Sequence, residues 1–352
     1  MRLGLIGLGR IGAFHTTTLV GIPAIDSLVV TDIVPEKTKT VVERFGGQGV
    51  EGPRVEGPRV EGPQVEGRDS VDALLASGVD GVIIAAGTDA HTTLILACVE
   101  AGLPTLCEKP VAPSGAEGAE LLRRLQGSTV PVQIGFQRRY DAAIAAAKAA
   151  VDSGELGWIN TIRSTTLDPE PPPAEYVAVS GGMYRDCGVH DFDIIRWISG
   201  QEAVEVYATG TNQGAEFFKQ YDDPDTSAAI VTFANGTLGV VSNTRYNGRG
   251  YDVRLEVHGS KDSVAAGVDE GWPIRATQPG VTFPSGQPHQ FFMDRFQPAF
   301  RAEFETFLEV VEGTCKSPCT VADGLEADWI AEACARSQKE HRPVRIEEVR
   351  IS

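Results

Sequence analysis

Short apolar runs alternate with amphipathic helical stretches through the first 135 residues of the chain. The apolar runs have the length of buried strands, and helical stretches such as 115–125 separate them. This alternation predicts an open parallel sheet with right-handed crossovers, because a parallel neighbour can be reached only by a crossing segment. The predicted strands lie at 3–6, 27–32, 80–87, 103–110 and 130–136.

The pattern changes after residue 135. In 251–258 the odd positions are apolar or aromatic and the even positions are polar, which predicts an antiparallel strand with one face on a core. We therefore divide this α/β chain into a domain of residues 1–135 and a second domain of residues 136–352, whose last helix can pack back on the first. The other predicted strands lie at 159–167, 203–209, 227–234 and 237–244, and the predicted helices lie at 141–153, 180–199, 299–312 and 322–338.

Residues 50–67 repeat the five-residue unit V-E-G-P-R/Q. A proline at every fifth position does not fit a regular helix or a central strand. We interpret the repeat as an exposed, polyproline-like loop inserted before the next strand–helix unit. An expanded insertion without function is preferred to the alternative of a partner-binding arm.

The composition is that of an ordinary globular protein, with 42% hydrophobic and 22% charged residues. The net charge of −17 argues against nucleic acid or an anionic membrane as a partner. No apolar run approaches the roughly 20 residues that cross a bilayer. The first apolar run is short and interrupted by glycines, so we expect no secretory signal.

The six cysteines are scattered along a long chain, which does not suggest a disulfide framework. Cys315 and Cys319 form the one close pair, but a second pair of metal ligands does not accompany them. We therefore expect a cytoplasmic protein without a bound metal.

A glycine pattern follows the first predicted strand directly. Gly7, Gly9 and Gly12 form G-x-G-x-x-G, with Arg10 and Ile11 inside it, ahead of a helix that runs to about residue 20. Glycines here permit a tight turn and let backbone N–H groups approach a pyrophosphate at the helix N-terminus. The motif therefore predicts a dinucleotide site.

Asp32 ends the second predicted strand, twenty positions after Gly12. A carboxylate there can accept hydrogen bonds from an adenosine ribose and repels a 2′-phosphate, so NAD is favoured over NADP. Arg10 is either a phosphate contact that weakens this preference or, as we prefer, a solvated residue. His15, in the following helix, is interpreted as structural.

Lys109 stands in Glu108-Lys109-Pro110, at the carboxyl end of strand 103–110. The carboxyl ends of parallel strands form the ligand side of such sheets, so Lys109 is either a site residue or a surface lysine. Pro110 restricts the backbone and allows a cis peptide bond. Thr88 and Asp89 are predicted to cap the helix that begins near residue 91.

Asp186 and His190 lie four residues apart in the predicted helix 180–199, on one helical face. A carboxylate one turn from an imidazole can fix its tautomer and stabilise the imidazolium during proton transfer. A surface Asp–His pair is the alternative. Ile194 and Trp197 continue this face into apolar residues and anchor the helix.

Five motifs in this order resemble the Gfo/Idh/MocA oxidoreductases, and inositol 2-dehydrogenases among them. The last predicted helix is also similar to that of the family, and the resemblance spans nearly the whole chain apart from the repeat. The motifs are GLGRIG at 7–12, DAH at 89–91, EKP at 108–110, GFQRRYD at 135–141 and D-x-x-x-H-D-x-D at 186–193.

The resemblance implies a Rossmann domain, then an α/β domain whose large, mostly antiparallel sheet supports dimers or tetramers. It implies a catalytic trio of Lys109, Asp186 and His190. It also implies cofactor contacts at Gly7, Gly9, Arg10, Ile11, Gly12, Asp32, Thr88, His91, Glu108 and Lys109, and substrate contacts at Lys109, Gln137, Asp168, Asp186, His190, Asp193 and Tyr251.

Two departures from the inositol enzymes affect the expected substrate. Thr166 and Asp168 stand where His and Asn would be typical, and Gln137 replaces a common apolar residue. These departures leave another cyclitol or a pyranose open as the substrate.

The expected reaction is reversible oxidation of a secondary ring alcohol to a ketone, with NAD⁺ as hydride acceptor. In this hypothesis His190 removes the hydroxyl proton, Asp186 orients His190, and Lys109 donates a hydrogen bond to the oxygen. The alternatives are a dehydrogenase of another pyranose, glycoside or anhydrosugar, or a regulator that binds nucleotide and sugar without catalysis. We expect a small-molecule polyol or sugar as partner and a homo-oligomer.

Overall fold

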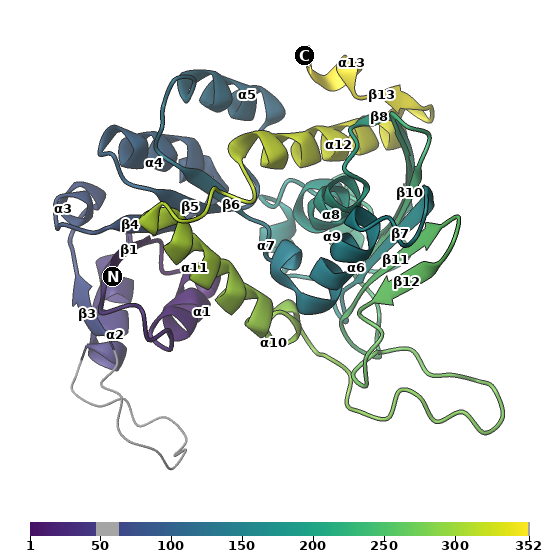
Figure 1. The fold of residues 1–352 in the computed structure, drawn as a ribbon, viewed down its shortest axis with the longest axis horizontal. Coiled ribbons are helices and arrows are strands. Elements are labelled where there is room, and N and C mark those ends of the chain that lie inside the picture. The colour runs from purple at the N-terminus through teal and green to yellow at the C-terminus, as the bar shows by residue number, and fades with distance from the viewer. Residues whose placement is uncertain (47–62, 351–352) are drawn as a thin grey trace. The chain divides into compact units, whose positions relative to one another are not determined.

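A computed structural model describes residues 1–46 and 63–350. The chain divides into two compact units, each described by itself (Figure 1). The first unit contains residues 1–113, 117–136 and 300–322. The second contains residues 114–116, 137–299 and the chain from Asp323 onward.

The first unit is built on a six-stranded parallel sheet with the order β3-β2-β1-β4-β5-β6. This is the doubly wound order of a dinucleotide-binding sheet, which confirms the predicted fold. Strands β1, β2, β4 and β5 are almost wholly buried, as expected where helices cover both faces. The strands are β1 Arg2–Ile6, β2 Ser27–Thr31, β3 Gln64–Gly67, β4 Gly81–Ile84, β5 Thr105–Glu108 and β6 Val132–Gly135, and the helices are α1 Arg10–Leu19, α2 Pro35–Phe45, α3 Val71–Leu75, α4 Thr88–Glu100 and α5 Gly115–Arg124, the last beginning at the unit boundary.

The end of the V-E-G-P repeat is a strand, which corrects the prediction of a loop over all of 50–67. Residues 64–67 form β3 and pair in parallel with β2. Val65 is buried, and Glu66 accepts from Arg2 Nη1 at 2.7 Å and from Arg68 Nη2 at 2.8 Å. These arginines lower the pKa of Glu66 to about 2. The part of the repeat before residue 63 lies outside the described residues.

Helix α11, Gln297–Glu312, returns to the first unit from Phe300 onward. The sequence analysis placed these residues in the second domain. Apolar contact explains the difference, because Phe304 and Phe307 of this helix are fully buried. Ser317 Oγ then donates to the carbonyl of Val132 at 3.1 Å, which fixes the following loop on β6.

The second unit is built on a seven-stranded sheet with the order β12-β11-β7-β10-β9-β8-β13. Every pair is antiparallel except β7 with β10, as the two-residue alternation predicts. The strands are β7 Ile159–Leu167, β8 Ala203–Thr211, β9 Thr226–Phe233, β10 Leu238–Thr244, β11 Asp252–Gly259, β12 Ser263–Ala266 and β13 Val344–Arg345, and the helices are η1 Gln137–Tyr140, α6 Ala142–Asp152, α7 Ala174–Val177, η2 Tyr184–Gly188, α8 Val189–Ser199, α9 Glu216–Gln220, α10 Phe292–Arg295, α12 Val321–Glu340 and α13 Glu347–Arg350.

One face of this second sheet carries the core of the unit. Alternate residues of β9 are buried, and helix α8 contacts both β7 and β10. The other face carries exposed apolar side chains, among them Tyr207, Ile230 and Leu238.

The predicted helix 180–199 is not continuous. Residues Tyr184–Gly188 form a π-helical turn, and the α-helix begins only at Val189 and ends at Gly200 in the left-handed region. Gly181 and Gly182 precede the turn with φ of +84°, a conformation that other residues rarely adopt. Single π turns inside helices occur frequently at functional sites.

None of the described helices is both long and apolar enough to cross a membrane. None of the six cysteines forms a disulfide in the described chain. Across residues 1–46 and 63–350, no group of three or more His, Cys, Asp or Glu side chains is arranged to hold a metal ion.

Candidate functional site

The glycines of the first turn form a cradle between β1 and α1. A Cβ atom at Gly7, where φ is +93°, would lie 2.5 Å from the backbone nitrogen of Ala86. A Cβ atom at Gly12 would collide with the carbonyl oxygen of Gly7. Gly9 instead faces open space, so a ligand can approach the backbone there. Arg10 is exposed and Ile11 half-buried in the first turn of α1.

The carboxylate of Asp32 is fixed at the edge of this cradle. Its Oδ2 accepts the N–H of Leu8 at 2.6 Å, and its Oδ1 accepts the N–H of Val34 at 2.8 Å. Lys37 Nζ lies 3.7 Å from Oδ1. A narrow glycine turn with a held carboxylate beside it suits a dinucleotide with a free ribose, so these residues fit NAD.

Helix α4 begins at Thr88 with Gly87 as its N-cap and has no side-chain cap. The prediction that Thr88 and Asp89 cap a helix near residue 91 is therefore wrong, because the helix starts three residues earlier. His91 is buried, with Nδ1 at 2.8 Å from the carbonyl of Pro110 and Nε2 at 3.2 Å from that of Ala86. Burial lowers the pKa of His91. Its ring thus contacts two loops at the carboxyl edge of the sheet.

Lys109 follows β5 directly and is half-buried. The Lys109–Pro110 peptide bond is cis, as the sequence allowed. Glu108 lies beside the buried His15, with Oε1 2.5 Å from His15 Nε2. The Glu108-Lys109-Pro110 turn is therefore contacted by one histidine on each side.

In the second unit the π turn places Asp186 against two polar partners. Tyr176 Oη donates to Oδ1 at 2.8 Å, and Arg245 Nη2 donates to Oδ2 at 2.7 Å. The other nitrogen of the Arg245 fork donates to Asp168 Oδ2 at 2.6 Å. His190 is half-buried in the first turn of α8. One arginine therefore joins two of the predicted site carboxylates.

Arg245 is a functional candidate that the sequence analysis missed. Burial opposes its charge, but Asp186 and Asp168 together hold the pKa of Arg245 well above its usual range. Burial also raises the pKa of Asp168 against the opposing effect of Arg245. Its position in the sequence could have indicated this role. Arg245 directly follows β10, which pairs in parallel with β7, the strand that leads to Asp168.

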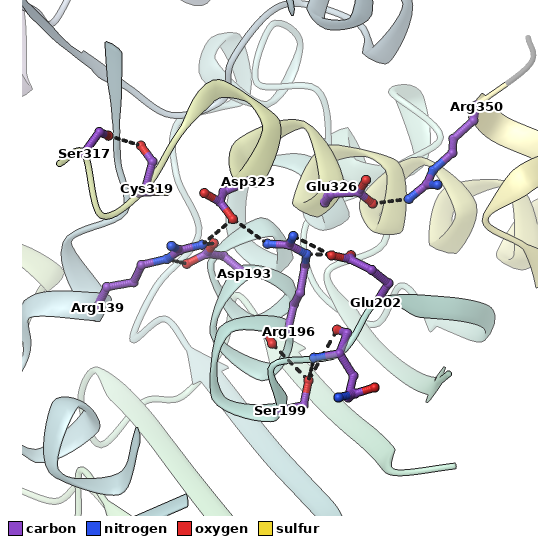
Figure 2. Close-up of polar contacts among 11 residues, drawn as sticks. Arg139, Asp193, Arg196, Ser199, Glu202, Ser317, Cys319, Asp323, Glu326 and Arg350 are labelled. Atoms are coloured by element: carbon purple, nitrogen blue, oxygen red, sulfur yellow. Dashed lines mark hydrogen bonds and ion pairs between the residues drawn. The ribbon is translucent and has the colours of Figure 1, made fainter. Parts of the chain in front are cut away.

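Asp193 lies in a different environment from Asp186. Its side chain has no exposed surface, and its two oxygens accept from Arg139 Nη2 at 2.5 Å and Nε at 2.9 Å. Figure 2 shows this pair beside Asp323, which accepts from Arg196 Nη1 at 2.8 Å. These contacts correspond to a structural ion-pair network rather than to a ligand-facing carboxylate.

The remaining predicted substrate residues are buried. Gln137 lies in η1, and Tyr251 packs its ring edge-on against Phe296 at 6.4 Å between centroids. Burial raises the pKa of Tyr251 above its ordinary value. Thr166 donates to the buried carboxylate of Asp191 at 2.9 Å, so its hydroxyl makes a hydrogen bond within the core.

Two family models match the chain. Residues 1–136 match the oxidoreductase family with NAD-binding Rossmann fold, GFO_IDH_MocA, and residues 144–265 match the GFO/IDH/MocA C-terminal domain. Both descriptions agree with the two sheets described above.

Similar proteins cover almost the whole chain. The myo-inositol 2-dehydrogenase of Thermotoga maritima is 31% identical over 99% of this chain and 99% of its own, and the inositol 2-dehydrogenase of Rhizobium meliloti is 33% identical over 98% and 99%. The crystal structure of scyllo-inositol dehydrogenase from Lactobacillus casei with bound NAD(H) and scyllo-inositol has a TM-score of 0.83 and 25% identity, over 99% of both chains.

Proposed function

Because the chain belongs to the GFO/IDH/MocA family and is an NAD-dependent oxidoreductase, we propose that it oxidises a secondary ring hydroxyl of a cyclitol such as myo-inositol. Two relatives named as inositol 2-dehydrogenases match this chain over at least 98% of both sequences. The observation that carries the proposal is the carboxylate of Asp186, held by Arg245 and Tyr176 one turn before His190. The first unit binds the dinucleotide and the second binds the polyol.

The glycine cradle and Asp32 would hold NAD, which when bound supplies the acceptor for the hydride of the alcohol carbon. His190 takes the hydroxyl proton, and the electron pair of the broken O–H bond forms the ketone C=O. Asp186 stabilises the imidazolium that results, since an opposite charge nearby favours the protonated ring. Lys109 donates a hydrogen bond to the oxygen as negative charge develops there.

Arg245 keeps this arrangement in one charge state. Two carboxylates this close would favour protonation of one of them, and the guanidinium fork between Asp168 and Asp186 opposes that. In this proposal Arg245 offsets the repulsion between the two carboxylates, and the carboxylate of Asp186 acts electrostatically on His190. Asp168 contributes to the proposed reaction by holding Arg245 in place.

The decisive experiment replaces Lys109 with Met and His190 with Asn separately. Turnover is followed as NADH formation with myo-inositol, scyllo-inositol and glucose. Each variant should lose about 10²–10⁴ in kcat, the usual contribution of a positioned acid–base or oxyanion group. NAD affinity and the unfolding transition are the controls. Near-full activity of either variant on a substrate of the parent would refute the roles.

A dehydrogenase of another pyranose, glycoside or anhydrosugar is the second candidate. The specific observation behind it is the Asp168–Arg245 pair together with the buried Thr166. Asp168 and Thr166 stand at the two positions where the resemblance to inositol enzymes leads us to expect Asn and His. The same substrate panel, extended to a methyl glycoside and an anhydrosugar, separates the two candidates by kcat/KM.

We also propose that the chain forms a homo-oligomer in the cytoplasm. The open face of the second sheet, with exposed Tyr207 and Ile230 side by side in the β8–β9 register, supports this contact. Six cysteines without a disulfide fit a reducing compartment. Light scattering of the parent and of Ile230→Lys should give a dimer or tetramer and a smaller species, respectively.

A further inference from the structure

His15 is a buried histidine that the proposed reaction does not use. It lies in α1, the helix that begins at the glycine cradle, and its side chain has no exposed surface. Its Nε2 is 2.5 Å from Glu108 Oε1. For its Nδ1, the described residues provide no hydrogen-bond partner. A proton on Nε2 lets the ring donate to this carboxylate.

Three aromatic side chains hold the ring in this orientation. Phe304 of α11 meets it edge-on at 4.9 Å between centroids, and Phe300 lies at 5.3 Å. The third, Phe14, lies at 5.9 Å. A buried nitrogen without a hydrogen-bond partner lowers stability, and a phenyl ring would fill the same space without that cost. The polar contact with Glu108 is the one feature here that requires a histidine.

Glu108 is joined through the main chain to Lys109. On the other side of the turn, His91 Nδ1 contacts the carbonyl of Pro110 at 2.8 Å. The segment that carries Lys109 is thus attached to α1 through His15 and to α4 through His91. A 1 Å displacement of a catalytic group can reduce a rate by about 10²-fold, so the position of this segment matters to turnover.

We propose that His15 is a positioning residue that sets the place of Lys109 relative to the dinucleotide cradle by donating to Glu108. This inference rests on the proposed function, in which Lys109 acts on the substrate oxygen. His15 and Glu108 act as one unit, and His15 itself contacts no reacting atom.

The test compares His15→Phe, His15→Gln, Glu108→Gln and the double variant His15→Phe/Glu108→Gln. His15→Phe keeps the aromatic packing and removes the donor, so kcat should fall about 10–100-fold while KM for the polyol changes less than about threefold. His15→Gln restores an N–H donor and should recover most of kcat. The double variant should lose no more than His15→Phe alone, because the loss of the donor already breaks the bond that Glu108→Gln can only weaken.

Thr18→Val is the matched control, since it removes a buried hydroxyl that donates to Phe14 on the same helix without contact to the turn. It should keep parental kcat. Parental kcat in His15→Phe, additive losses in the double variant, or equal loss in His15→Gln and His15→Phe would overturn the proposal. Lys109→Met separates the two hypotheses. If it is active, the proposed function fails. If it is inactive while His15→Phe is fully active, only the positioning role fails.

Discussion

Asp186 and Asp193 are seven residues apart, and each is paired with an arginine, but the two pairs differ in how much of the carboxylate they leave available. Arg139 bonds both oxygens of Asp193, whose side chain is fully buried. Arg245 divides its fork between Asp186 and Asp168, and Asp186 keeps 11% of its side chain exposed. Arg139 also lies 3.9 Å from Asp323, so both arginines reach a second carboxylate. What separates the two aspartates is that Asp193 has both oxygens bonded to one arginine and no exposed surface. We therefore expect the partly exposed carboxylate to serve the proposed reaction and the enclosed one to serve stability.

The largest effect should come from Asp186→Asn. The amide keeps the shape and an acceptor for Tyr176 but loses the charge that stabilises the His190 imidazolium, so kcat should fall about 10²–10⁴-fold. The free energy of unfolding should change by less than about 1 kcal/mol, because the site stays hydrogen-bonded. Steady-state kinetics with NAD⁺ and denaturant unfolding check both. A stable variant with parental kcat would remove the distinction between the two aspartates.

Asp193→Ala should show the opposite profile. It removes the carboxylate that bonds Arg139 twice and leaves Asp323 at 3.9 Å from the buried guanidinium. Removing one member of a buried ion pair typically costs about 3–5 kcal/mol of stability. Urea unfolding measures the loss. Glu202→Ala is the matched control, because Glu202 pairs with Arg196 at 2.7 Å with 52% of its side chain exposed, and such pairs contribute at most about 1 kcal/mol. Equal losses in the two variants would contradict the comparison.

Arg245→Lys tests the Asp186 side of the comparison between the two aspartates. One ammonium cannot reproduce a planar fork that reaches two carboxylates, so Asp186 should be held less firmly and kcat should fall about tenfold. A shift of the kcat–pH profile toward higher pH should accompany the loss, since a less compensated Asp186 binds protons more readily. Unchanged kcat and an unchanged profile would mean that Arg245 only supports the fold.

The smallest effect concerns Asp223, a third carboxylate of the second unit, which pairs with no arginine among the contacts described. It accepts the N–H of Met183 at 2.7 Å, and burial raises its pKa to about 6. The native state therefore holds this proton to higher pH than the unfolded chain does, and stability should decrease as pH rises from 5 to 7. The decrease should be about 1 kcal/mol and absent in Asp223→Asn. A parent with the same pH dependence as the variant would contradict this assignment.

Much of the fold follows from local pattern. Buried parallel strands appear in the sequence as short apolar runs, so β1 and β2 were predicted to within one residue of their observed ends. β4 lies inside the longer predicted strand 80–87. The nine residues of β7 coincide with the predicted strand. β3 did not appear, because its V-E-G residues repeat the triplet of the five-residue unit that precedes it in the sequence. The π turn did not appear either, since the spacing of Asp186 and His190 also fits an uninterrupted α-helix.

The site was less accessible to sequence reasoning than the fold. The glycine cradle and Asp32 are local, and their spacing alone places them together. The arginine partners of Asp186, Asp168 and Asp193 lie 54 to 77 positions away, so only the folded chain shows which arginine meets which carboxylate. For the same reason, His15 could be interpreted as structural from sequence, but its contact with Glu108 could not be foreseen.

The sequence of β3 is a copy of the repeat that precedes it, and this affects which changes in repeat number the first sheet can tolerate. β3 needs one buried valine, Val65, and one acidic residue, Glu66, to meet Arg2 and Arg68. The repeat offers the same V-E-G triplet at 55–57 and 60–62. If one unit were lost or duplicated by slippage during replication, the strand would be supplied with an equivalent triplet and the sheet would keep its edge. The number of repeat units can therefore change while β3 keeps the valine and the glutamate that it needs.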